Sequence, residues 1–333
     1  MNPGNRGSRA RGESLGSGDS SQPKDRPVPH VAHCFTAALL LTLCGADSAA
    51  GQERAVLRPR LEANRLPPAL PAHAEAFEFT LPRPPADRTT VPALAAGLDD
   101  PSVRNACLAG LVRLDLATLR RHAADLPAAR LRQLLADPAT DADAADACGF
   151  LFGVADPNAG NAVLSQAILE RAKRGDAAAG CVTGLLLCGG EPAVSWLENL
   201  CERPRCPLGF TLSALNAADV ARRDRGFGLE ADRLDRFAAA LLTSDAAAEA
   251  AVDQLAAWRA WAHAPAVLAA AANSRDADEL RRRSLQVGAA RFALNCAADP
   301  AGGPHGRLCR EWLSETAVTD ADLVRRAKRI AGR

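Results

Sequence analysis

The feature that most constrains the fold is a series of apolar runs that fills the chain from Thr90 onward. Each run has roughly 10 to 16 residues, a length expected of helices rather than strands, and short turns separate the runs. No alternating strand pattern of any length occurs among them. The 73 alanines, more than one residue in five, also favour closely packed helices. The sequence therefore predicts an all-α fold for residues 91–331.

The turns between the runs share an acidic residue followed by proline. The pairs are Asp100-Pro101, Asp137-Pro138, Asp156-Pro157, Glu191-Pro192 and Asp299-Pro300. An acidic side chain caps the helix that follows, and proline fits the first helical position because no hydrogen bond is lost there. The first, second and fourth pairs are separated by 37 and 54 residues, and the third precedes the fourth by 35. Separations on this scale indicate a two-helix repeat.

Residues 91–114 carry this pattern in full. They read Val-Pro-Ala-Leu-Ala-Ala-Gly-Leu-Asp-Asp-Pro-Ser-Val-Arg-Asn-Ala-Cys-Leu-Ala-Gly-Leu-Val-Arg-Leu. The stretch resembles one HEAT repeat, in which a first helix ends in Leu and Asp, proline follows, and Val-Arg opens the second helix. The positions that match the family are Leu94, Leu98, Asp100, Pro101, Val103, Arg104, Ala106, Ala109, Leu111 and Leu114.

Residues 265–298 resemble a second HEAT repeat, with a first helix at 266–272. Val103 and Leu280 lie 177 residues apart, about five periods of 35 residues. Residues 157–201 keep the helix pairs but lack the Val-Arg step. The matching positions of the second repeat are Asp276 and Asp278 in the turn and Leu280, Arg281, Ser284, Leu285 and Leu294 in the second helix.

The resemblance implies a short solenoid of stacked antiparallel helix pairs over residues 91–331, with a concave face that binds a partner. It implies structural roles for Asp100, Pro101, Val103 and Arg104, and Arg104 is expected to bond to the nearby turn or to the adjacent repeat. It implies no catalytic residue.

The first 50 residues predict export. Residues 1–30 are rich in Gly, Ser, Pro and Arg and poor in large apolar side chains, so a disordered leader is expected. An uncharged run and then small residues over 35–50 resemble a secretory signal cleaved before Gly51. The run is too short for a transmembrane helix. A lipoprotein cleavage at Cys44 is the alternative, although Leu43 is large for the position before it.

Residues 51–90 hold seven prolines, which break helices and favour extended backbone. This stretch is expected to be a linker, or an arm that lies on the helical body. Phe77 and Phe79 would anchor such an arm, because alternate residues of an extended segment share one face.

Residues 177–190 carry no charged side chain and should form the most buried helix. Gly180 and Gly184 form a small-x-x-x-small pair, and Gly149 and Gly153 repeat that spacing earlier in the chain. Such pairs let two backbones approach closely, which predicts tight helix packing.

Beyond the leader and signal, eight cysteines remain. In an oxidising compartment an even number permits disulfides, and Cys201 with Cys206 and Cys296 with Cys309 are the expected pairs. The alternative is that cysteine serves as a small core residue, as expected of Cys107, Cys148 and Cys181. The eight are Cys107, Cys148, Cys181, Cys188, Cys201, Cys206, Cys296 and Cys309.

Composition excludes several chemistries. The chain has no tyrosine, and its one methionine is at position 1, so it lacks a tyrosine nucleophile and a methionine ligand for haem or copper. No Cys-x-x-Cys-His string, phosphate loop or Gly-x-Ser-x-Gly motif occurs. After residue 50 the chain holds 35 basic and 35 acidic residues, which is not the basic footprint of a nucleic-acid binder.

Two metal-site patterns are weak. A calcium loop at Asp141, Asp143 and Asp146 lacks the glycine and the closing glutamate, so a solvated helix N-terminus is the better interpretation. A cysteine set with zinc-ligand chemistry lacks the close two-residue spacing of such ligands. That set is Cys181, Cys188, Cys201 and Cys206.

The candidate partner-binding residues are an arginine cluster and a tryptophan pair. Arg222, Arg223 and Arg225 alternate with acidic residues, a pattern typical of a salt-bridged surface. Trp258 and Trp261 stand three apart, which places them on one face of a helix. Core packing is expected for Trp258, whereas an exposed tryptophan on a groove would be the strongest anchor for a partner.

The sequence thus predicts an exported, non-catalytic binding or scaffolding module whose partner is a protein of the cell envelope. It predicts no cofactor, no nucleic-acid partner and no membrane span after signal cleavage. The alternative is a periplasmic all-α enzyme of the lyase or hydrolase type. Such an enzyme needs converging histidines and carboxylates, and no histidine lies in a known metal or nucleophile motif. The histidines in question are His73, His122, His263 and His305.

Export predicts a shortened mature protein. Because signal cleavage removes the leader, the intact mass of protein from the native host should lack the residues before about Gly51. Recovery of a full-length chain from the cytosol would contradict this prediction.

Overall fold

The computed structural model describes residues 90–174, 178–203, 206–244, 246–274 and 278–332, all within the unit Pro67–Arg333. These residues form α-helices and short 3-10 turns without a strand, so the predicted all-α class is confirmed for them. The predicted leader, signal and proline-rich arm lie outside the described residues. The helices are α4 (Val91–Ala96), α5 (Arg104–Val112), α6 (Leu116–Arg121), α7 (Ala128–Ala136), α8 (Ala142–Ala155), α9 (Pro157–Arg174), α10 (Ala179–Cys201), α11 (Leu208–Arg223), α12 (Ala231–Ala240), α13 (Ala248–Ala257), α14 (Ala264–Asn273), α15 (Glu279–Ala298), α16 (Gly303–Thr319) and α17 (Ala321–Ile330).

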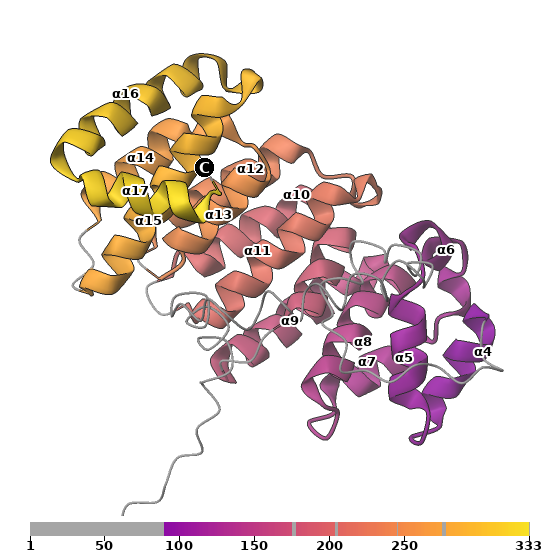
Figure 1. Ribbon diagram of the computed structural model, residues 1–333. Coiled ribbons are helices and arrows are strands. Elements are labelled where there is room, and N and C mark those ends of the chain that lie inside the picture. The colour runs from indigo at the N-terminus through magenta and orange to yellow at the C-terminus, as the bar shows by residue number, and fades with distance from the viewer. Residues whose placement is uncertain (1–89, 175–177, 204–205, 245, 275–277, 333) are drawn as a thin grey trace, which may run out of the picture. The chain divides into compact units, whose positions relative to one another are not determined.

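Each helix packs mainly against helices close to it in sequence (Figure 1). The most extensive contacts lie between α8 and α10, between α10 and α11, and between α9 and α10. In the C-terminal part, α15 contacts α13, α14, α16 and α17. One continuous apolar core connects residues from α4 to α16, and it consists largely of alanine, leucine and valine with a few phenylalanines. The small side chains account for how closely these helices pack.

Several side-chain hydrogen bonds between helices span nearly the same number of residues. Asn105 Nδ2 donates to Asp141 Oδ2 at 2.8 Å, and Ser284 Oγ to Glu249 Oε1 at 2.5 Å, across 36 and 35 residues. The other separations fall between 35 and 40 residues. Each of these bonds joins elements that do not follow each other directly along the chain. The further pairs are Glu198–Arg233, Asp219–Gln254, Asp219–Trp258, Arg259–Asp299 and Arg283–Asp320.

Glycine sets the distance between α8 and α10. A Cβ atom added to Gly153 would lie 2.5 Å from the carbonyl oxygen of Gly184 and 2.8 Å from its Cα. A Cβ atom on Gly184 would lie equally close, 2.5 Å, to the carbonyl oxygen of Gly149. The two backbones are thus in direct contact, and the predicted close packing of the small-x-x-x-small pairs is confirmed.

Helix α10 is kinked at Gly190, which has φ 56° and ψ −142°. This conformation suits glycine because side chains with a Cβ atom rarely adopt positive φ. Pro192 follows Gly190 by two residues, and because proline has no backbone N–H it cannot donate a hydrogen bond to the preceding turn of the helix. The Glu191-Pro192 pair, which was expected to separate two helices, therefore marks a kink between two helical segments that follow each other directly.

The other acid-proline turns differ in what they cap. Asp156 accepts a bond from the backbone N–H of Ala159 at 3.0 Å, and α9 begins at Pro157 as predicted. Asp137 caps only a turn, accepting from the N–H of Ala139, and helix α8 is capped instead by Asp141. An Asp-Pro pair therefore predicts a turn more reliably than it predicts the first residue of a helix.

The HEAT-like positions at the start of the domain lie around the turn between α4 and α5. Asp100 Oδ1 accepts bonds from the Ser102 N–H at 2.9 Å and its hydroxyl at 2.6 Å, and Pro101 is exposed beside it. Arg104 Nε donates to the carbonyl oxygen of Leu98 at 3.0 Å, across the turn. Val103 packs partly buried against the core. All four residues thus shape the turn.

We predict opposite effects for two glycine-to-alanine substitutions. Gly153→Ala should lower the free energy of unfolding by about 1 to 3 kcal/mol, because its methyl group overlaps the α10 backbone. Gly288→Ala, in α15, should raise it by about 0.5 to 1 kcal/mol, because its methyl group would meet Val252 Cγ1 at 3.6 Å while alanine favours the helix. Urea unfolding of both variants measures the difference. Equal effects of the two substitutions would contradict the backbone contact.

Candidate functional site

Asp219 of α11 gathers donors from two helices. Trp258 Nε1 donates to Asp219 Oδ1 at 2.7 Å, and Gln254 Nε2 donates to the same oxygen at 3.0 Å. The second oxygen, Oδ2, lies 2.8 Å from Nη2 of Arg223. This carboxylate therefore holds the C-terminal end of α13 against α11.

Arg222 adds α12 to the same junction. Its Nε donates to Asp235 Oδ1 at 2.9 Å and its Nη2 to Oδ2 at 3.4 Å. Its guanidinium carbon lies 5.2 Å from the ring centroid of Trp258, a cation–π distance. Arg222 therefore joins α11 to α12 through a charge pair, as expected for salt-bridged helices, and contacts Trp258 at the end of α13 through its ring.

The tryptophan pair is not an exposed anchor. Trp258 is 7% exposed and Trp261 is 6% exposed, so the core packing expected of Trp258 is confirmed and neither indole has the exposure that an anchor for a partner requires. Arg222 and Arg223 both bond to carboxylates of the protein itself. Arg225 alone of the predicted set is exposed without a carboxylate partner among the described residues. The aromatic faces serve packing instead.

The two tryptophans do not share a helix. Helix α13 ends at Ala257, and Arg259 follows with φ 56°, a region that residues other than glycine rarely adopt. The Ala260 N–H donates to the Leu255 carbonyl at 3.0 Å, and the Arg259 N–H to that of Ala256 at 3.1 Å. This is the Schellman arrangement of a helix C-terminus, with arginine where glycine is usual. Trp261 then begins a 3-10 turn.

Asp299 explains why arginine occupies this position. Its carboxylate accepts bonds from Arg259 Nε at 2.7 Å and Nη2 at 2.6 Å, from Trp261 Nε1 at 2.8 Å, and from the Ala301 N–H at 2.9 Å. These donors, Arg259 foremost, lower the pKa of Asp299 to about 2. Trp261 packs edge-on against Phe292, 5.1 Å between centroids. The ion pair thus fixes a strained helix end against the α15–α16 turn.

Asp146 is a buried charge that the sequence interpretation misplaced. Asp141 caps α8 and Asp143 is exposed, as a solvated helix N-terminus requires, but the side chain of Asp146 is only 13% exposed. The backbone amides of Gly180 and Cys181, at the start of α10, act to lower the pKa of this carboxyl. Asp146 therefore faces the N-terminal end of a neighbouring helix rather than solvent. Its spacing of three and seven residues before Gly149 and Gly153 was the available signal for this inward face.

Arg171 of α9 completes this buried cluster. Its Nη2 lies 3.4 Å from Asp146 Oδ1, and its side chain is 6% exposed. Burial raises the pKa of Asp146, whereas Arg171 and the helix amides act in the opposite direction. The ion pair thus connects three helices at the glycine contact, and loss of one partner would leave a buried charge.

The structure brings Cys201 and Cys206 together. Cys201 lies in the last turn of α10 and is 4% exposed, whereas Cys206 is partly exposed two residues before α11. Each of the two thiols shifts the pKa of the other, as neighbouring sulfur atoms do. The Thr211 hydroxyl lies 3.5 Å from Cys206 Sγ. Both cysteines are free thiols here.

The two thiols of this pair differ in acidity. The hydrogen bond from Cys201, assisted by Thr211 and nearby Arg203, lowers the pKa of Cys206 to about 6. The same contact with Cys206, together with burial, raises the pKa of Cys201 far above its ordinary value. The two shifts have opposite directions, which favours a thiolate at Cys206 over one at Cys201.

The second predicted pair is buried. Cys296 of α15 and Cys309 of α16 are both 0% exposed, and each of their thiols also shifts the pKa of the other. Burial raises the pKa of Cys309 to about 12 and also raises that of Cys296. Cys107, Cys148 and Cys181 are core thiols, as expected of small apolar residues.

No three side chains of the metal-ligating types converge within the described ranges, and the four-cysteine zinc set is not assembled there. Of the histidines, His122 lies partly exposed at the end of α6 with Nδ1 2.8 Å from Asp125 Oδ2. His263 ends a 3-10 turn and His305 lies in α16. His73 lies outside the described residues.

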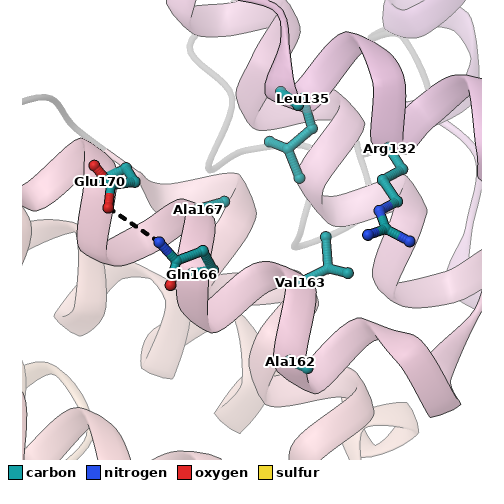
Figure 2. A pocket seen from close by; sticks show the side chains of 8 residues that line it. Arg132, Leu135, Ala162, Val163, Gln166, Ala167 and Glu170 are labelled. Carbon is teal, nitrogen blue, oxygen red and sulfur yellow. Dashed lines mark hydrogen bonds between the residues drawn. The ribbon is translucent and has the colours of Figure 1, made fainter.

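A groove of about 470 Å³ lies between α7 and α9 (Figure 2). Figure 2 shows small aliphatic side chains between Arg132 on α7 and Glu170 on α9. Gln166 Nε2 donates to Glu170 Oε1 at 3.0 Å. Neither the sequence motifs nor the repeat resemblance identified this surface. Its lining residues are Arg132, Leu135, Ala136, Ala162, Val163, Gln166, Ala167 and Glu170.

No family model, curated protein or solved structure matches the chain. The resemblance to HEAT repeats therefore stays a prediction. The functional argument depends on the geometry of the described residues.

The Asp299 cluster predicts a loss of stability in acid. The pKa of Asp299 is lowered to about 2. The contribution of its carboxylate to the free energy of unfolding is therefore complete above about pH 4 and is lost as the pH falls from about 4 to about 2. The difference in free energy of unfolding between wild type and Asp299→Asn should shrink over this interval, because asparagine does not titrate. Urea unfolding at successive pH values measures it. A difference that stays constant down to about pH 2 would contradict the lowered pKa.

Proposed function

We propose that this chain is an exported, non-catalytic scaffold, built as a short HEAT-like solenoid, which binds a protein of the cell envelope in the groove between α7 and α9. The observation that carries the proposal is the groove itself. Its floor is aliphatic and its rim is charged, and its lining holds no histidine, cysteine or hydroxyl side chain. Such a surface suits binding better than acid–base or nucleophilic chemistry.

The polar links between helix pairs support the repeat architecture. Their sequence separations of 35 to 40 residues match the length of one two-helix unit. In a helical repeat, each unit contacts its neighbours, and the neighbouring-helix contacts of the described residues follow this rule. The periodic links add a tertiary argument to the HEAT-like turn at Asp100-Pro101.

The chemistry of the groove indicates the kind of partner. Ala162 and Ala167 on α9 leave room for a close approach, which favours an amphipathic helix laid into the groove. Arg132 is exposed and pairs with no carboxylate among the described residues, whereas Glu170 already pairs with Lys173 at 2.8 Å. The partner segment should therefore present small aliphatic residues and an acidic side chain that meets Arg132.

Export supplies the setting of this interaction. It depends on residues 35–50, which lie outside the described residues. Within the described ranges, no helix is long and apolar enough to cross a bilayer. The partner is therefore proposed to be a protein of the envelope that the helical body reaches after signal cleavage.

Site-specific photo-crosslinking in the native host tests the proposal. A photoreactive residue at Ala162 or Ala167 should give one defined crosslinked protein, because both positions line the groove. Arg132→Glu should reduce the yield on the order of tenfold, because it places like charges against the acidic partner residue. Mass spectrometry of the crosslinked peptide identifies the partner segment and its sequence.

Two controls make this test specific. A photoreactive residue at Val318, which is 87% exposed on α16, should not give the same product. Arg325→Glu, an exposed charge reversal on α17, should leave the groove crosslink unchanged. A product obtained equally from Val318, or one insensitive to Arg132→Glu, would refute the groove as the binding surface.

A further inference from the structure

The pair Cys201–Cys206 combines proximity with access, which distinguishes it from the other cysteines of the described residues. The pair Cys296–Cys309 has proximity, but both its residues are 0% exposed. Cys188 has access, but its thiol donates to the carbonyl oxygen of Leu185 and no second thiol is placed beside it among the described residues. A dithiol reaction needs both properties.

The two thiols lie at opposite poles of two helices. Cys201 ends α10, where the helix carries partial negative charge, and Cys206 precedes α11, where the 16-residue helix presents partial positive charge. A thiolate is stabilised at the second position and disfavoured at the first. Thr211, in the first turns of α11, places its hydroxyl where it donates to a Cys206 thiolate.

We propose that Cys201 and Cys206 form a thiol–disulfide exchange site, in which Cys206 attacks an accessible disulfide of a small aliphatic thiol and Cys201 resolves the product. This activity is independent of partner binding in the groove. Its geometry rests on the placement of the two cysteines at the two ends of one short connection between α10 and α11, on the partial exposure of Cys206, on the burial of Cys201, and on the Thr211 hydroxyl 3.5 Å from Cys206 Sγ.

The reaction has two balanced steps. The Cys206 thiolate attacks one sulfur of the disulfide RSSR, forms a mixed disulfide with it and releases RS⁻, which takes up a proton from water. Cys201 then loses its proton, and its sulfur attacks Cys206 Sγ in the mixed disulfide, which releases the second RS⁻. The protein ends with a Cys201–Cys206 disulfide, and RSSR is reduced to two RSH. The lowered pKa of Cys206 supports its role as the attacking group.

The surroundings of the pair fit a small disulfide. Leu208 and Leu212, one helical turn apart on α11, are 40% and 38% exposed. They provide an apolar surface that begins two residues after Cys206. The turn that precedes Cys206 carries Arg203, which adds positive charge beside the attacking sulfur.

Exchange with glutathione disulfide tests the proposal. The reduced full chain, treated with glutathione disulfide, should form the Cys201–Cys206 disulfide ahead of any bond at Cys296 or Cys309. Trypsin cleaves after Arg205 and so separates the two cysteines, which makes the disulfide visible as a crosslinked pair of peptides. At pH 5.5, Cys206 should exchange roughly tenfold faster than glutathione itself, because its larger thiolate fraction outweighs its lower nucleophilicity.

Single substitutions separate the two roles. In the Cys201→Ser protein the reaction should stop at a mixed disulfide, with one glutathionyl group on Cys206. In the Cys206→Ser protein Cys201 should form neither a mixed disulfide with glutathione nor an internal disulfide. Cys188→Ser and Cys309→Ser are the matched controls and should leave the reaction unchanged. Thr211→Val should move the pH dependence of exchange to higher pH while retaining the product, as expected of a positioning residue.

Three results would overturn the proposal. One is a glutathionyl group on Cys201 in the Cys206→Ser protein at the wild-type rate. Another is oxidation of Cys296–Cys309 as fast as that of Cys201–Cys206. The third is a wild-type exchange rate at pH 5.5 no greater than that of glutathione, a measurement that needs no variant and so does not depend on variant folding.

Discussion

The backbone contact between α8 and α10 is the constraint on which the rest of the structure depends. Gly153 and Gly184 have no space for a Cβ atom, so the two helices meet at their peptide planes. That contact brings the start of α10 close to Asp146, which pairs with Arg171 of α9. The direction of the first segment of α10, before the kink at Gly190, follows from it. A substitution at the glycine contact would therefore also disturb the buried ion pair.

Several charged side chains at helix junctions bond to other side chains of the protein. Asp219, Asp235 and Asp299 bind arginine, tryptophan or glutamine side chains from other elements, and they do so across helix junctions. These bonds orient neighbouring helix pairs, because a bidentate or shared carboxylate admits few geometries. A side chain such as Arg132, exposed at a groove rim and without such a partner among the described residues, is then available for a different role. The same reasoning that assigns Arg222 to structure supports the proposed role of Arg132 in binding.

Environment decides which cysteines are reactive. Cys296 and Cys309 touch each other in the core, where burial disfavours a thiolate, and their pKa values rise. Cys206 touches Cys201 at the positive end of α11, where a thiolate gains two hydrogen-bond donors and partial access to solvent. The buried pair Cys296–Cys309 is therefore expected to be unreactive, whereas the partly exposed pair Cys201–Cys206 suits the proposed exchange reaction.

The sequence by itself determined the helical class, most turns and the glycine contact, because these depend on periodicity, on missing side chains and on short spacings. It did not determine the helix end at Arg259, the inward orientation of Asp146 or the groove beside Arg132. A helix end at a residue other than glycine costs about 1 kcal/mol, and here a carboxylate 40 residues away stabilises it. Bonds between distant residues leave no local pattern. Only the tertiary structure decided which polar groups are satisfied, and therefore which remain for function.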